Sequence, residues 1–205
     1  IANAMEPRAC AAQWTAATKD MTVWTTSQNP HIIRFGLSAV TLPMLDEHKL
    51  RVISPDVGGG FGSKIFHYPE EVIVPWIAMK INRPCKWVAT RSESFMTDSQ
   101  GRDHVQKCKM ALKSDGTMTG LYAELHADMG AYLSSIAPLI PTVICITLFS
   151  GLYKNPGIWG ETTGTLTNTV PVDAYRGAGR PEASYLVERL VDVAAQELKM
   201  DPIEI

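Results

Sequence analysis

Apolar and polar residues follow two different spacings along this chain, which predicts a mixture of strands and helices. Short alternating or apolar segments predict strands at 11–15, 21–25, 50–54, 86–90, 105–112, 121–128 and 160–169. Apolar residues at helical spacing predict helices at 31–42, at 68–81 and from 181 onward. Strands and helices do not alternate strictly, so the pattern favours the α+β class with mixed sheets and packed helices.

The last helix has the clearest pattern, and the segment 136–149 has the least clear one. Pro181 stands where a first helical residue would be, and apolar residues then recur on one helical face. The segment 136–149 is apolar throughout, and its periodicity allows either a buried helix or a buried strand. It is too short to cross a bilayer and contains Pro138 and Pro141, so we expect no membrane span.

Composition narrows the possible classes of protein. The 205 residues are 45% hydrophobic and 20% charged, with a formal net charge of -2 and no long basic block. These values are typical of a globular protein that does not bind nucleic acid. Cys10, Cys85, Cys108 and Cys145 form no C-x-x-C pair, so we expect free, mostly buried thiols in a reducing cytoplasm. The five histidines lack metal-ligand spacing, which predicts ordinary surface or core histidines.

A glycine cluster, 58–62, follows the predicted strand at 50–54. Glycines allow positive φ, and successive backbone N–H groups in such a turn can hold an anion. The Walker A pattern fails because Ser63 separates the last glycine from Lys64. The Rossmann pattern fails because Ser63 stands where its third glycine is required. The cluster is therefore either a different kind of ligand-binding loop or a structural turn.

A second glycine loop, 174–180, lies directly before the last helix. Gly177 and Gly179 free the backbone at a helix N-terminus, while Arg176 and Arg180 add positive charge. The alternative is an ordinary helix start with surface arginines. Gln28, in Thr-Ser-Gln-Asn-Pro at 26–30, could donate from its amide to an oxo or phosphoryl oxygen, although alone it reads as a turn residue.

Three motifs in one order carry a resemblance to a known family. They are Thr-Ser-Gln-Asn-Pro at 26–30, Pro-Asp-Val-Gly-Gly-Gly-Phe-Gly-Ser-Lys at 55–64 and Ala-Tyr-Arg-Gly-Ala-Gly-Arg-Pro-Glu-Ala at 174–183, after Met-Glu-Pro-Arg at 5–8. Together they resemble the molybdopterin-binding large subunit of the molybdenum hydroxylases, the xanthine dehydrogenase and aldehyde oxidase family. The third motif is similar to the loop of form II relatives of the aerobic carbon monoxide dehydrogenase large subunit. The resemblance implies that residues 1–205 are part of a molybdenum cofactor-binding domain, with both ends cut from a longer protein.

The resemblance also implies the cofactors and partners. Molybdenum would be held by a pterin dithiolene, usually as the cytosine dinucleotide form in bacteria, and not by side chains of this chain. A [2Fe-2S] centre and FAD would be carried by partner subunits of a cytoplasmic hetero-oligomer. The substrate would be a small molecule.

Position by position, the resemblance implies the following site. Gln28 would hydrogen-bond a molybdenum oxygen ligand or the cofactor. Four residues of the first loop would lie against the metal and the pterin: Gly59, Gly60, Phe61 and Gly62. Four residues of the second loop would line the substrate side of the metal: Arg176, Gly177, Ala178 and Gly179. The family's catalytic glutamate base would lie beyond Ile205, so the general base is not in this chain.

The chain departs from the family pattern at three positions, and the first two of them, Gly177 and Ile65, guide the choice of reaction. Gly177 stands where carbon monoxide dehydrogenases have a copper-binding cysteine, Ile65 stands where purine-oxidising members have a glutamate, and Asn3 replaces a histidine. We therefore expect an oxidoreductase that hydroxylates an aldehyde or N-heterocycle with water-derived oxygen. Carbon monoxide dehydrogenase is the alternative within the family, a non-catalytic binding module is the alternative from another class, and a generic phosphate-binding protein ranks third. If Gly177 lies at the metal, Gly177→Val is expected to abolish turnover and leave the fold intact.

Overall fold

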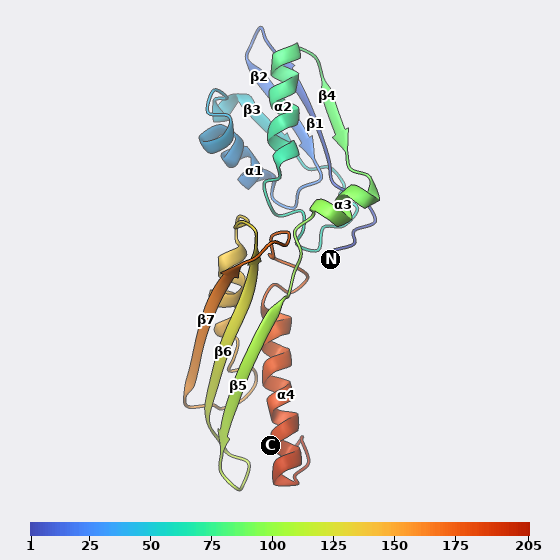
Figure 1. Ribbon diagram of the computed structural model, residues 1–205. Helices are drawn as coiled ribbons and strands as arrows, with labels where there is room; N and C mark the ends of the chain where they lie inside the picture. The colour runs from blue at the N-terminus through green and yellow to red at the C-terminus, as the bar shows by residue number, and fades with distance from the viewer. The chain divides into compact units, whose positions relative to one another are not determined.

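The structure, a computed structural model, describes all of residues 1–205, and the chain forms two compact units. The first unit comprises Ile1–Ser99 and the second comprises Gln100–Ile205. Each unit has its own mixed sheet and its own helices, as Figure 1 shows. The α+β class predicted from the sequence is confirmed.

The sheet of the first unit has four strands in the order β3-β2-β1-β4. Its strands are β1 (Ala9–Thr15), β2 (Asp20–Thr25), β3 (Leu50–Ile53) and β4 (Cys85–Val88). Strand β1 is antiparallel to both β2 and β4, whereas β2 and β3 are parallel. All four strands were predicted, with boundaries that differ by a few residues at most.

The helices of the first unit connect these strands. Helix α1 (Pro30–Gly36) begins at Pro30 and continues as a π-helical turn over Leu37–Thr41, and α2 (Pro69–Ile81) carries Pro75 inside it. A 3-10 turn, Glu47–Lys49, precedes β3. Helix α3 (Arg91–Thr97) was not predicted, although Thr90 and Glu93 form a capping box at its start.

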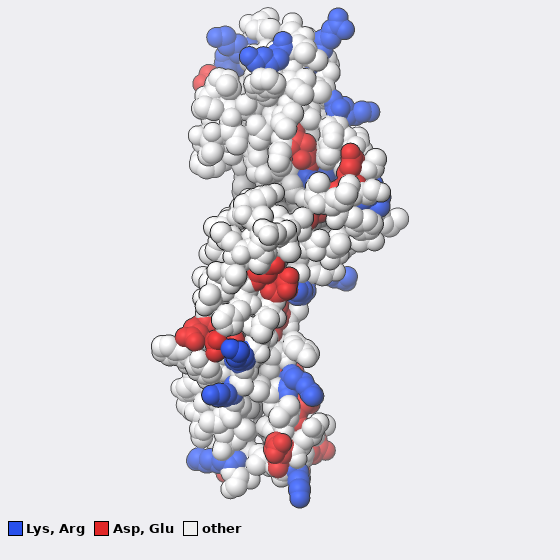
Figure 2. All heavy atoms as spheres, in the orientation of Figure 1, with Lys and Arg blue, Asp and Glu red and all other residues white.

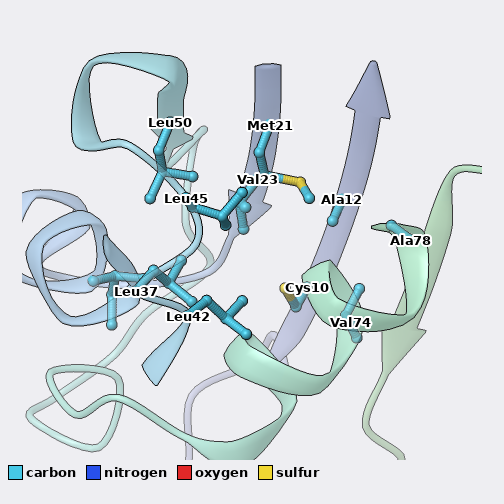
Figure 3. Packing of buried hydrophobic residues seen from close by; sticks show 11 residues of the cluster. Cys10, Ala12, Met21, Val23, Leu37, Leu42, Leu45, Leu50, Val74 and Ala78 are labelled. Carbon is cyan, nitrogen blue, oxygen red and sulfur yellow. The ribbon is translucent and has the colours of Figure 1, made fainter. Parts of the chain in front are cut away.

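The core of the first unit lies between its sheet and its helices. Figure 3 shows side chains of β1, β2, the 37–45 segment and α2 pointing toward one another. Met21, Val23 and Leu37 are fully buried, and Val74 and Ala78 bring α2 onto the sheet. Burial of each large aliphatic side chain contributes about 1.5–3 kcal/mol, so this core gives the loops at the sheet edge a rigid support.

The sheet of the second unit has three strands in the order β5-β6-β7. Strands β5 (His104–Leu112) and β6 (Met118–Gly130) form the predicted antiparallel hairpin, with Gly116 at φ +86° in its turn. Strand β7 (Ile158–Leu166) runs parallel to β6. The segment between them is helical, with a 3-10 turn at Ala137–Leu139 and a π-helical turn at Ile140–Ile144, which resolves the ambiguity left by its periodicity.

Helix α4 (Arg180–Leu198) covers this sheet. Ala183, Leu186 and Val187 pack against inward-facing side chains of β6 and against Cys145 and Phe149. This packing fixes where α4 begins, and therefore fixes the loop that precedes it. None of the helices is both long and apolar enough to cross a membrane. All four cysteines are free thiols; Cys10 and Cys145 are buried and the other two are half-buried.

Candidate functional site

The first glycine loop links β3 to the segment before α2 and departs from ordinary backbone geometry at three residues. Gly59 has φ +95°, Gly62 has φ +103°, and Phe61 has φ +55°. Only glycine adopts such angles without strain, and a left-handed non-glycine residue costs about 1–2 kcal/mol. Phe61 is nevertheless 43% exposed. Strain at an exposed loop residue is typical of a segment shaped for binding.

Gln28 lies directly against this loop. Its Oε1 accepts a hydrogen bond from the Gly62 N–H at 2.9 Å, and its backbone N–H donates to the carbonyl of Lys64 at 2.8 Å. A Cβ placed on Gly60 would lie 2.2 Å from the same Oε1, so only glycine permits this approach. The structure therefore brings together Gln28, Gly60 and Gly62, which the sequence motifs separate by more than 30 residues. Because Oε1 is engaged, the exposed Gln28 side chain presents Nε2 as its donor.

Lys64 and Glu6 brace the start of the same loop. Lys64 Nζ donates to the Glu6 carbonyl at 2.8 Å and lies 3.2 Å from Glu6 Oε2. Glu6 Oε2 also accepts from the Gly58 N–H at 2.7 Å, and the Glu6 N–H donates to the Gly58 carbonyl at 3.2 Å. Burial lowers the pKa of Lys64, although its contact with Glu6 opposes that shift. Lys64 ends the motif at 55–64, but no sequence pattern indicates its contact with Glu6, 58 residues away.

A buried arginine supports the end of the loop. Arg8 makes an ion pair from Nε to Asp98 Oδ1 at 2.7 Å and a second one from Nη1 to Glu70. Its guanidinium lies 3.6 Å from the centre of the Tyr68 ring. The Tyr68 hydroxyl donates to the Ser63 carbonyl at 2.7 Å. The Met-Glu-Pro-Arg segment thus contacts the glycine loop on one side through Glu6 and anchors its far end through Arg8.

Glu71 is, after Arg8, a second buried ionisable residue near the first glycine loop, and it contacts Thr25 and Tyr68. Its Oε1 accepts from the Thr25 hydroxyl at 2.6 Å and its Oε2 accepts from the Tyr68 N–H at 3.0 Å. Burial raises the pKa of Glu71 to about 7, against the lowering effect of those two hydrogen bonds and of Arg8. Glu71 therefore titrates near neutral pH.

The second glycine loop belongs to the second unit and has three successive left-handed residues. They are Gly177 at φ +111°, Ala178 at φ +45° and Gly179 at φ +87°, directly before α4. A Cβ on Gly177 would lie 2.5 Å from Cγ of Pro181. This contact and the positive φ count against the expectation that Gly177→Val leaves the fold intact, and we now expect substitution here to destabilise the second unit. The loop needs this glycine for its own packing against the first turn of α4.

Arg102 holds the second loop from the start of β5. Its Nη1 donates to the Tyr175 carbonyl at 2.7 Å, and its Nη2 donates to the Arg176 carbonyl at 2.9 Å. Its guanidinium also lies 4.9 Å from the Tyr175 ring centre and 3.4 Å from the buried Glu182 carboxylate. Arg102 was not a predicted site residue, because 73 residues separate it from Tyr175 and no motif marks it.

The first loop, with Gln28, offers backbone groups and one amide; the second loop, in the other unit, offers backbone groups and the positive charge of Arg176 and Arg180. No cluster of three or more His, Cys, Asp or Glu side chains in the chain could hold a metal ion. On the face seen in Figure 2, Lys and Arg are interspersed with Asp and Glu. At the first loop, the exposed Gln28 amide and the backbone N–H groups suit a ligand that brings its own metal.

Comparisons with known proteins point to one family. Residues 1–205 match the family model described as a molybdopterin cofactor-binding domain. The chain is 37% identical over 203 residues to the carbon monoxide dehydrogenase large chain of Hydrogenophaga pseudoflava, covering 98% of this chain and 25% of that protein. It is 32% identical over 205 residues to the nicotine 6-hydroxylase large subunit of Paenarthrobacter nicotinovorans, with the same coverage of both proteins.

A solved structure of a related enzyme has the same fold over nearly the whole chain. Quinoline 2-oxidoreductase from Pseudomonas putida 86 superimposes with a TM-score of 0.91 at 31% identity, over 98% of this chain and 25% of that chain. The chain thus spans about a quarter of the length of the relatives that it matches.

Proposed function

This chain belongs to the family of molybdopterin cofactor-binding domains, and from that premise we propose that it is a cofactor-binding segment of a molybdenum hydroxylase. Residues 1–205 would form part of a larger cofactor-binding domain. Gln28, Gly59, Gly60, Phe61 and Gly62 would lie against the metal and the pterin. Arg176, Gly177, Ala178 and Gly179 would line the substrate side.

The observation that carries this proposal is the fixed orientation of Gln28. The Gly62 N–H occupies Oε1, so Nε2 is the end of the amide that can donate to an oxygen of the cofactor. A donor that is already oriented needs no reorganisation when it meets a developing negative charge, which is the basis of electrostatic preorganisation. Gly60 contributes by leaving the space that the Gln28 side chain itself occupies.

When bound, the cofactor supplies redox chemistry that adds water-derived oxygen to a carbon of the substrate. We propose the cytosine dinucleotide form of the pterin, with [2Fe-2S] and FAD on partner subunits. The names of the relatives support several subunits, since they are a large chain, a large subunit and, in a third relative, a dehydrogenase complex subunit. Four free thiols support a cytoplasmic location.

An aldehyde or N-heterocycle is the proposed substrate class. Two relatives are named for nicotine and quinoline, both N-heterocycles, which supports the second of these. Carbon monoxide oxidation remains the alternative because the relative that is 37% identical is a carbon monoxide dehydrogenase large chain. Gly177 argues against it, since glycine has no side chain with which to bind copper.

Metal and nucleotide analysis tests the proposal directly. The full-length subunit that contains this chain, purified with its partners, is expected to hold about one molybdenum and to release about one CMP per subunit on hydrolysis. Activity assays with an N-heterocycle, an aldehyde and carbon monoxide would then separate the substrate classes. A folded, assembled complex with neither molybdenum nor CMP would reject the enzyme proposal in favour of a binding module.

A further inference from the structure

We propose that Lys64 is a positioning residue that holds Gln28 and the first glycine loop in one fixed arrangement. It does so through Glu6 on one side and through its own backbone carbonyl on the other. The inference rests on the proposed function, because the arrangement that Lys64 holds is the proposed cofactor site.

The first connection runs from the Lys64 side chain to the start of the loop. Its Nζ binds both the carbonyl and the carboxylate of Glu6, at 2.8 Å and 3.2 Å. Glu6 in turn makes two hydrogen bonds with Gly58, one through its side chain and one through its backbone N–H. A Cβ on Gly58 would lie 2.6 Å from Cβ of Glu6, so this close contact requires glycine. The Lys64 ammonium thus fixes the Glu6 side chain that accepts the Gly58 N–H at the first residue of the loop.

The second connection runs from the Lys64 backbone to Gln28. The Lys64 carbonyl accepts from the Gln28 N–H at 2.8 Å and from the Ser27 hydroxyl at 3.3 Å. The Gln28 side chain returns to the loop at Gly62. Lys64 thus contacts the segments that contain Glu6 and Gln28, and it stands two residues after Gly62 in the chain. Lys64 is 58 residues from Glu6 and 36 residues from Gln28 in the sequence. Its two contacts therefore join parts of the chain that are distant in sequence.

The burial of Lys64 makes its ammonium dependent on Glu6. The Lys64 side chain is 2% exposed, whereas Glu6 is 37% exposed. A buried ammonium without its partner is strongly unfavourable, so loss of either group disrupts the pair.

A double-mutant cycle in the full-length, cofactor-loaded enzyme tests the inference. The variants are Lys64→Met, Glu6→Ala and the pair together, with Glu6→Gln as the conservative change that keeps an acceptor for the Gly58 N–H. The matched control is Leu50→Ala, a buried residue of the same unit that lies in its hydrophobic cluster. Molybdenum content after gel filtration, kcat and KM determined separately, and the melting temperature are measured for each protein.

We expect Lys64→Met and Glu6→Ala each to lower kcat at least about tenfold with KM changed less than about twofold, since small displacements of positioned groups mainly affect the chemical step. Molybdenum content should fall in both, the double variant should be no worse than the more affected single variant, and Glu6→Gln should retain most activity. Leu50→Ala should lower the melting temperature while keeping kcat and molybdenum.

Three results would overturn the inference. They are unchanged kcat and molybdenum in Lys64→Met, effects of Lys64→Met and Glu6→Ala that multiply in the double variant, or an equal loss of kcat in Leu50→Ala. A wild-type enzyme that contains no molybdenum would reject the proposed function instead, so the two failures are distinguishable.

Discussion

The two glycine loops of this chain reach their shapes by different physical means. The first loop is held by side chains distant in sequence, above all by Gln28 and by the Lys64–Glu6 pair. The second loop has three successive left-handed residues directly before α4. It is held by Arg102, which donates to two of its carbonyls, and Gly179 lies close to the backbone of Ile140 and Cys145. The two loops are both rich in glycine, but they require glycine for different physical reasons.

The difference shows most clearly in why each glycine is needed. Gly60 has an ordinary φ, and what requires glycine there is the approach of Gln28 to 2.2 Å from its absent Cβ. Gly177 requires glycine for its own backbone angle and for contact with Pro181. Substitution at Gly60 should therefore affect function, whereas substitution at Gly177 should affect folding.

The largest effect is expected for Gly60→Ala. The added methyl would push the end of the Gln28 side chain away from Gly62. Because that side chain is exposed, it can move without disturbing the core, so the unit should fold while losing the oriented donor. We expect kcat/KM of the loaded enzyme to fall roughly 100-fold, in the range found for loss of one preorganised donor, with the melting temperature nearly unchanged. Gly120→Ala is the matched control, because its Cβ would meet nothing closer than 3.8 Å. Normal activity in Gly60→Ala would remove Gln28 from the site.

Gly177→Ala should lower the free energy of unfolding of the second unit by about 2–3 kcal/mol, because left-handed strain and the Pro181 contact add together. Denaturant unfolding followed in the second unit, again beside Gly120→Ala, measures this loss. A stable Gly177→Ala protein that lacks activity would instead mean that this glycine is needed only for close approach of a ligand, and the contrast between the loops would fail.

Glu71 makes the support of the first loop sensitive to pH. Its folded pKa of about 7 lies above its ordinary value of 4.5, so the folded state binds this proton more tightly than the unfolded state does. The free energy of unfolding should therefore fall by about 2–3 kcal/mol as pH rises from about 4.5 to about 7, and Glu71→Gln should remove that dependence. Unfolding curves across this pH range test it; an unchanged slope in Glu71→Gln would assign the dependence to another group.

The smallest effect is expected for Ala178→Gly. Ala178 has φ +45°, and glycine relieves that strain while adding entropy to the unfolded chain. We expect a gain of about 0.5–1 kcal/mol in the free energy of unfolding of the second unit. A loss of stability would show that the methyl group of Ala178 contributes packing that outweighs the strain.

Periodicity predicted most of the secondary structure of this chain, because strands and the long helix α4 carry their pattern locally. It did not decide the 136–149 segment, since an apolar run fits a helix or a strand equally well. Helix α3 was missed although its capping box, Thr90 with Glu93, was readable in the sequence.

For the candidate site too, local sequence patterns indicated some residues and missed others. The motifs located Gln28 and both glycine loops, but not the partners that hold them. Lys64 meets Glu6 across 58 residues, and Arg102 meets the loop across 73 residues. Such contacts depend on how the chain folds back on itself, and no local pattern encodes them. The clash at Gly177 was also invisible, because it depends on where the Pro181 ring lies.

The most direct test of the account is the position of the metal. A crystal structure of the cofactor-loaded enzyme, with anomalous data collected on both sides of the molybdenum absorption edge, locates that atom without assumptions about the protein. We predict a single molybdenum peak beside the first glycine loop, with Gln28 Nε2 within hydrogen-bonding reach of an oxygen on the metal. A molybdenum peak remote from Gln28 and from Gly59 to Gly62 would contradict the assignment of this loop as the cofactor site.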